Sequence, residues 1–173
     1  AAEQPSVAER VASVRDLLAR RLKATVSDLV VNAEESVRAP HLLSVAIPGA
    51  DSEALLMHFD LAGVAVSSGS ACSTGAVEPS HVLVAMGIPR ELALGTIRFS
   101  LGRETSETDI ERAVEVFPGV VEKVRKLAGV LGRSGGQSVS RSVGQAVNQV
   151  SGSNSAQRER GATSEPTAQE GTR

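Results

Sequence analysis

The segment 67–75, with the sequence SSGSACSTG, constrains the fold more than any other, because it holds nothing that could fill a hydrophobic core. Its residues are small, and Cys72 is the only cysteine of the chain. This composition predicts an exposed, mobile loop. An apolar run, 64–66, precedes the loop, and Pro79 and Ser80 beyond it suit the start of a helix. The loop must therefore join two stretches of regular structure and expose its thiol.

Upstream of this loop the hydrophobic pattern predicts two helices and three strands. Ser6 and Glu9 form a capping box at the start of the first helix. Asp51 or Ser52 caps the second helix, and Gly63 is placed to end it. The expected elements are the helices 6–23 and 52–62 and the strands 29–31, 42–47 and 64–67.

Downstream of the loop, residues 96–101 alternate between apolar and polar side chains. Ile97, Phe99 and Leu101 fall on one face, and Arg98 and Ser100 fall on the other. This period of two predicts a strand with one core face and one polar face.

Three further helices are expected after the loop. Ser106 with Asp109 caps the last of them, and Pro118 is expected to kink or split it. The predicted ranges are 80–86, 89–94 and 106–131. Four short strands among irregularly placed helices indicate an α+β fold, a small mixed sheet covered by helices.

From Gly132 onward the composition changes. The segment 132–173 contains no Leu, Ile, Phe or Met and is dominated by small and polar residues. It cannot bury enough apolar surface to offset its ordering entropy, so a disordered tail is predicted. Valines recur there at helical spacing, which leaves a transient or partner-induced helix open; these are Val139, Val143, Val147 and Val150.

The global composition limits the class of protein. A formal net charge of −2 and a pI near 6.0 give no electrostatic reason to expect nucleic acid or an anionic membrane. No apolar run approaches the length of a membrane span, and one cysteine cannot form an internal disulfide, so a reducing cytoplasm is the expected compartment. No metal is expected, because His41, His58 and His81 lack ligand spacing.

Two residues are candidates for chemistry. Cys72 is a candidate nucleophile, since its loop gives access and His81 or Arg98 could lower its pKa; the alternative is a cysteine acting as a small hydrophobe. Arg98 lies on the polar face of its strand. An arginine fork suits a substrate carboxylate, whereas the structural alternative is an ordinary surface ion pair.

Three ordered motifs carry a resemblance to a known family. The segments SSGSAC (67–72), EPSHVL (78–83) and IRFSLGR (97–103), supported by 51–56 and 61–67, are similar to the C-terminal part of a NifS/IscS-like cysteine desulfurase of the class V aminotransferase fold. The similarity extends over about residues 6–127. It implies the small C-terminal domain of a fold-type I enzyme that depends on pyridoxal 5′-phosphate (PLP).

The resemblance assigns roles to both candidates. Cys72 would attack the sulfur of free L-cysteine, giving a protein persulfide and L-alanine, and Arg98 would bind the substrate carboxylate. It also implies a homodimeric full-length enzyme that passes sulfur to an iron–sulfur scaffold or another acceptor protein. One stretch departs from the family, which commonly has an asparagine in the strand before Pro48-Gly49, where this chain reads Leu43-Ser44-Val45.

The resemblance also implies that PLP is held elsewhere. The family's PLP lysine belongs to a large domain upstream, and Lys23, the only lysine before Cys72, does not resemble its motif. The expected organisation is a connecting helix over 1–23, the small domain over 24–131 and the tail over 132–173. Two alternatives stay open: a non-catalytic sulfur-carrying or protein-binding module acting in trans, and a truncated, inactive product.

Overall fold

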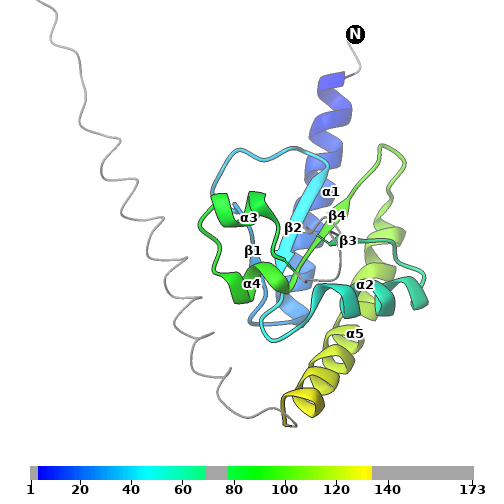
Figure 1. The fold of residues 1–173 in the computed structure, drawn as a ribbon. Helices are drawn as coiled ribbons and strands as arrows, with labels where there is room; N and C mark the ends of the chain where they lie inside the picture. Colours follow the sequence, from blue (N-terminus) through cyan, green and yellow to red (C-terminus); the bar gives the residue numbers. More distant parts are fainter. Residues whose placement is uncertain (1–3, 69–77, 134–173) are drawn as a thin grey trace, which may run out of the picture.

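The computed structural model describes residues 4–68 and 78–133, so Cys72 and the segment 134–173, with the disorder predicted for it, lie outside the described residues. Helices and short strands are interspersed along the described part (Figure 1). In chain order these are α1 (Gln4–Thr25), β1 (Val30–Val31), β2 (Leu42–Ala46), α2 (Ser52–Leu61), β3 (Ser67–Ser68), α3 (His81–Ala85), α4 (Arg90–Leu94), β4 (Thr96–Ser100) and α5 (Glu107–Arg133).

The strands form one four-stranded sheet in the order β1-β2-β4-β3. All three pairings are antiparallel. The predicted α+β class is confirmed, but the sheet is antiparallel rather than mixed. A parallel neighbour needs a crossover connection, usually a helix, and the connection from β1 to β2 contains none.

The two faces of the sheet differ. Leu43, Val45, Ile97 and Phe99 are buried on one face, in a single core with residues of α1, α2 and α5. The short helices α3 and α4 pack on the other face, where Leu83 and other side chains form a smaller apolar cluster. Figure 1 shows α3 and α4 on the side of β2 and β4 away from α5. The helices α3 and α4 leave part of this second face open to solvent.

The large core is centred on the three phenylalanines of the chain. The ring of Phe59 lies 6.2 Å from that of Phe99 and 5.5 Å from that of Phe117, between centroids. The rings come from α2, β4 and α5. Aromatic contacts of this kind add about 0.5–1.5 kcal/mol each beyond area burial. They fix β4, and with it Arg98, against the helical layer.

Several helix ends are as predicted. The Asp51 side chain accepts a hydrogen bond from the amide of Ala54, which makes it the N-cap of α2. Gly63, with φ +75°, ends α2, and the amide of Val64 donates to the carbonyl of Phe59.

At the start of α5 the Ser106 amide, and then its hydroxyl, donate to the Asp109 carboxylate, which lowers the pKa of Asp109. The predicted capping pair is therefore confirmed.

Three local predictions are wrong. Ser6 is not the N-cap of the first helix, because α1 already begins at Gln4 and a proline at position 5 is tolerated in a first helical turn. The third strand is Ser67–Ser68 rather than 64–67, since the amide of Val64 is used to close α2. The third, that Pro118 kinks or splits the last helix, is wrong as regards the split: α5 is one helix, held by buried side chains on both sides of the proline, such as Phe117 and Val121.

None of the helices in residues 4–68 and 78–133 combines the length and the apolarity that crossing a membrane would require.

Candidate functional site

Arg98 occupies the middle of β4. It pairs with Ser44 of β2 on one side and with Ser67 of β3 on the other. Directly paired residues of antiparallel strands point to the same face, so these three side chains share the face opposite the phenylalanine core. Arg98 is exposed, and its guanidinium forms no ion pair with any other described residue. The alternative of an ordinary surface ion pair therefore has no support in this part of the chain.

A hollow of about 380 Å³ lies beside Arg98 on this face. The polypeptide around it comes from the turn after β1, from β2, from the start of α3 and from β4. Its walls include Arg38, His81 and Arg98 but no aspartate or glutamate. Two guanidinium groups without a carboxylate among them make the hollow suited to an anion.

The segment after β1 contributes two polar side chains to the hollow, the buried Asn32 and the half-buried Arg38. The Asn32 side-chain amide nitrogen donates to the Ser44 hydroxyl at 3.0 Å, and the Asn32 main-chain amide donates to the Ser44 carbonyl at 2.9 Å. Arg38 lies 3.5 Å from a carboxylate oxygen of Asp16 on α1. Asn32 Oδ1 and Arg38 Nη1 are the buried side-chain atoms that lack a hydrogen-bond partner in the described part of the chain.

The same turn carries an unusual backbone conformation. Ala33, which also lines the hollow, has φ +55° and is the one non-glycine residue with positive φ among residues 4–68 and 78–133. A left-handed conformation costs an alanine about 1–2 kcal/mol. Such conformations persist where the surroundings enforce them, and they gather at functional sites.

One flank of the cysteine-bearing segment pairs with Arg98, and the other lines this hollow. Ser67 pairs with Arg98, and Ser80, next to the N-terminus of α3, lines the hollow. Cys72 itself is outside the described residues, so its nucleophilic role stays a prediction. His81 and Arg98, the two residues predicted as able to lower the pKa of its thiol, both line the hollow.

The remaining histidines lie elsewhere. His41 precedes β2, and its carbonyl accepts a hydrogen bond from the amide of Leu101. His58 is half-buried within α2.

The position of the lysines shows whether the residues at this hollow could hold PLP. PLP attachment needs a lysine amine at the reacting carbon. The chain has three lysines, and none of them lines the hollow. Lys23 pairs with Glu34 at 2.9 Å, Lys126 pairs with Glu122, and Lys123 is exposed on α5. The described residues therefore do not fit PLP.

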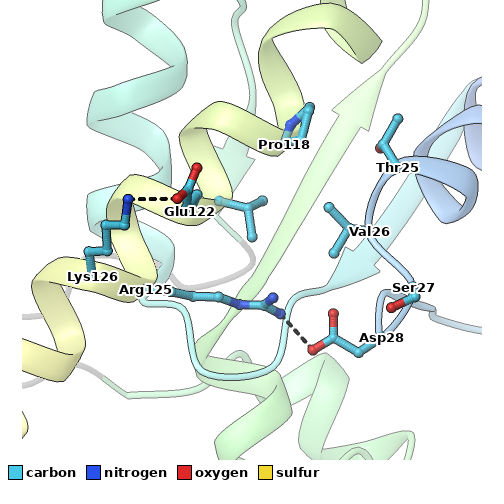
Figure 2. Close-up of a pocket in the computed structure, with 9 residues that line it drawn as sticks. Thr25, Val26, Ser27, Asp28, Pro118, Glu122, Arg125 and Lys126 are labelled. Atoms are coloured by element: carbon cyan, nitrogen blue, oxygen red, sulfur yellow. Dashed lines mark hydrogen bonds and ion pairs between the residues drawn. The ribbon is translucent and has the colours of Figure 1, made fainter.

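A second hollow, of about 470 Å³, lies between the end of α1 and α5 (Figure 2). Its charges are neutralised locally: Arg125 is 2.8 Å from Asp28, and Lys126 is 2.6 Å from Glu122. The hydrogen bond from Lys126 lowers the pKa of Glu122. Arg125 also donates to the carbonyl of Pro48, which ties α5 to the end of β2. These contacts link α5 to neighbouring segments and are accounted for by a role in the stability of the fold. None of the predicted site residues lines this second hollow.

Sequence reasoning missed Asn32 and Arg38. Both lie between the predicted strands 29–31 and 42–47, and neither lies in a periodic pattern. What identifies them is that both residues line the hollow and each has a buried polar atom without a partner. This arrangement exists only once the segment after β1 is folded against β2 and α1.

Known proteins match part of this chain. A family model described as aminotransferase class V matches residues 2–113. A cysteine desulfurase IscS from Dictyoglomus turgidum is 40% identical over 120 residues, which are 69% of this chain and 30% of that protein. A cysteine desulfurase IscS from Anaeromyxobacter is 46% identical over 125 residues, 72% of this chain and again 30% of the relative.

A solved structure matches as well. The X-ray structure of a NifS-like protein from Rickettsia africae has a TM-score of 0.58 at 30% sequence identity, over 66% of this chain and 29% of that one. The chain thus spans about 30% of the length of the relatives it matches.

Proposed function

The chain belongs to the class V aminotransferase family, and from this premise we propose that it forms the cysteine-bearing part of a PLP-dependent cysteine desulfurase. Cys72 is assigned as the nucleophile and persulfide carrier, and Arg98 as the residue that binds the carboxylate of L-cysteine. Since no lysine lies at the hollow, the proposal assigns PLP, which labilises the carbon–sulfur bond of the substrate, to residues outside these 173.

One observation supports this assignment above the others: the segment that carries Cys72 begins at the strand partner of Arg98, Ser67, and ends near Ser80, which lines the same hollow as Arg98. From Ser67, the strand partner of Arg98, to Cys72 is a path of five residues, and an extended chain covers at most about 3.6 Å per residue. The Cα atom of residue 72 is therefore within roughly 18 Å of the Cα atom of Ser67, the strand partner of Arg98, for any conformation of the segment.

The chemistry proposed for this chain is a sulfur transfer. The Cys72 thiolate attacks the sulfur of L-cysteine, a sulfur–sulfur bond forms on Cys72, and the carbon–sulfur bond of the substrate breaks. The carbon skeleton is released as L-alanine after it takes up a proton. A thiolate is the competent form, so a lowered pKa at Cys72 would favour the step.

The proposal extends to the partners and the organisation. The persulfide passes to an acceptor such as an iron–sulfur scaffold or a thiolation enzyme, in the cytoplasm, from a homodimeric full-length enzyme. Residues 1–23 are assigned as the connecting helix, 24–131 as the small domain and 132–173 as a disordered tail.

A chimera tests the enzyme proposal. Residues 2–113 replace the matching region of the Dictyoglomus turgidum relative, and alanine release from L-cysteine is measured with a thiol reductant present. We expect Cys72→Ala to abolish alanine release and Ser73→Ala, the matched neighbour, to retain it. Alanine release by the Cys72→Ala chimera at the rate of the parent chimera would refute the role of Cys72.

A second candidate is favoured by the lack of a lysine at the hollow: a sulfur-carrying module that receives sulfur in trans. Incubation of the chain with a complete desulfurase and L-cysteine would then add one sulfur atom to Cys72, detected by mass spectrometry. If the chimera turns over and the separate chain gains no sulfur, the enzyme proposal is favoured.

A further inference from the structure

We propose that the segment 137–150 folds back as a helix along α5 and fills the second hollow, the one between the end of α1 and α5. The occupant of this surface is thus a named part of the same chain and not a second protein. The surface is separate from the hollow of Arg98, so the inference does not rest on the proposed function. The disorder assigned to the tail then holds for 151–173 rather than for all of 132–173.

The second hollow is an uncovered stretch of one face of α5. Nearer the start of α5 this face carries α1, since Arg21 Nη1 of α1 lies 3.5 Å from Glu111 Oε1. Pro118 and Arg125 follow Glu111 at intervals of seven residues, close to two helical turns, and so lie on the same face. Both line the hollow of about 470 Å³, and Figure 2 shows the end of α1 and the turn after it on the opposite side. The hollow therefore lies where α5 loses its helical neighbour.

Toward the end of α5 the same face carries no bulky side chain. Gly129 and Gly132 continue the face of Arg125 at helical spacing. Gly129 is exposed, and a Cβ atom there would meet nothing within 4 Å. Glycine lets another backbone approach closely. At the hollow itself the charges of Arg125 and Lys126 are paired, with Asp28 and Glu122, so a segment without carboxylates meets no unpaired charge there.

The segment 137–150 has the composition that this face requires. Its apolar stripe consists of valines at helical spacing, Val139, Val143, Val147 and Val150. Arg141 is its only charged residue and falls on the opposite side of such a helix. Gly152 follows the last valine and is a helix stop signal. A helix of this length is marginal in water by itself, so the stripe needs a partner surface.

The register of the two stripes identifies that surface. Two antiparallel helices joined by a short loop pair symmetrically about the middle of the loop, because both rise by the same distance per residue. A loop over 132–136, with the sequence GRSGG, is centred on residue 134. The resulting pairs are Val139 with Gly129, Val143 with Arg125, Val147 with Val121 and Val150 with Pro118. The valines therefore meet the face of the hollow at every position.

The docked state requires one change in α5. The helix runs to Arg133, so Gly132 and Arg133 must leave it to form the loop. Glycine is a poor helix former, and helix ends shift readily by one or two residues. In return, Val147 and Val150 cover the half-buried Pro118 and the hydrocarbon stem of Arg125 at the hollow.

The test is disulfide formation within the 173-residue chain carrying Cys72→Ser, so that no other thiol reacts. Ser27 is exposed and lines the second hollow, and Ser151 follows the last valine of the stripe. A chain with Ser27→Cys and Ser151→Cys is compared, in a glutathione redox buffer, with a chain that carries Ser164→Cys in place of Ser151→Cys. A flexible tail closes these two loops at rates that differ by about twofold, because effective concentration falls roughly as the −3/2 power of length. We expect the pair at 27 and 151 to close about tenfold faster or more.

Two neighbouring substitutions assign the contact. Val147→Gln replaces a valine that faces the hollow, and it should bring the two closure rates to within about threefold of each other. Asn148→Gln places the same side chain at the next residue, on the polar side of the helix, and should leave the rate unchanged. In the unmutated chain the main-chain amides of 139–150 should exchange with deuterium about tenfold more slowly, or more, than those of 160–170.

Each of three results would overturn the inference. The first is a closure rate at 151 within about threefold of that at 164, or amides over 139–150 that exchange as fast as those of 160–170. The second is an unchanged rate in Val147→Gln, because the valine stripe sets the register. The third is a disulfide between two chains, seen as a covalent dimer whose yield rises with protein concentration. The hollow would then take the tail of a second copy.

Discussion

Gly95 joins α4 to β4, and replacing it with alanine should destabilise the fold at the point that positions Arg98. A Cβ atom at this position would lie 2.4 Å from the carbonyl oxygen of Ile47 and 2.8 Å from that of Ala50. Both contacts are with backbone, so no side chain can rotate away to relieve them. The amide of Ile47 also donates to the Gly95 carbonyl at 3.0 Å, and the movement that relieves the clash would stretch this bond.

The magnitude follows from these two effects. Overpacking of a well-packed region costs about 1–3 kcal/mol, and a backbone hydrogen bond contributes about 1 kcal/mol. We therefore expect Gly95→Ala to lower the free energy of unfolding by about 2–4 kcal/mol. The measurement is urea unfolding followed by far-ultraviolet circular dichroism, with the midpoint and the slope fitted separately.

Gly119 is the matched control. It lies exposed within α5, and a Cβ there would meet nothing within 4 Å. Because glycine inside a helix is less stable than alanine by about 0.5–1 kcal/mol, Gly119→Ala should raise the free energy of unfolding by that amount. The two substitutions are chemically identical and have opposite expected signs. A Gly95→Ala chain within about 0.5 kcal/mol of the parent, as is usual for surface changes, would refute the steric argument.

Three further changes test separate contacts. Asp51→Ala removes the side chain that caps α2 at Ala54 and should cost about 1 kcal/mol, measured by the same unfolding assay. Phe59→Ala empties the centre of the aromatic core and should cost about 3–5 kcal/mol, with a smaller loss refuting the central place of this ring. The Ser106 amide lowers the folded-state pKa of Asp109, so its contribution is present above the unfolded-state pKa and is lost as pH falls through the folded-state value. Asp109→Asn should therefore destabilise the chain at neutral pH and match the parent in strong acid; a difference independent of pH would contradict this.

Local periodicity predicted the strand of Arg98. In residues 97–101 burial alternates with the sequence pattern, because Ile97 and Phe99 must face the helical layer and this leaves Arg98 on the other side. The helix ends at Asp51 and Gly63 were also predictable, since capping depends on residues within one turn of each other.

The rest of the site depends on contacts between distant segments. Asn32 donates a hydrogen bond to Ser44, and Arg38 forms an ion pair with Asp16. No spacing in the sequence indicates these partners. Nor does anything in the sequence indicate that Ala33 adopts a left-handed conformation, which favours glycine. The extent of β3 was missed for a similar reason, because the amide of Val64 donates to the Phe59 carbonyl and closes α2.

The three packed phenylalanines have a practical consequence for observing this protein. The chain has no tryptophan and no tyrosine, so its near-ultraviolet circular dichroism comes from Phe59, Phe99 and Phe117 alone. These rings contact one another where α2, β4 and α5 meet, directly behind the strand of Arg98. The weak phenylalanine signal therefore reports on a single place in the fold. An absorption band at longer wavelength in the purified chain would have to come from a bound chromophore.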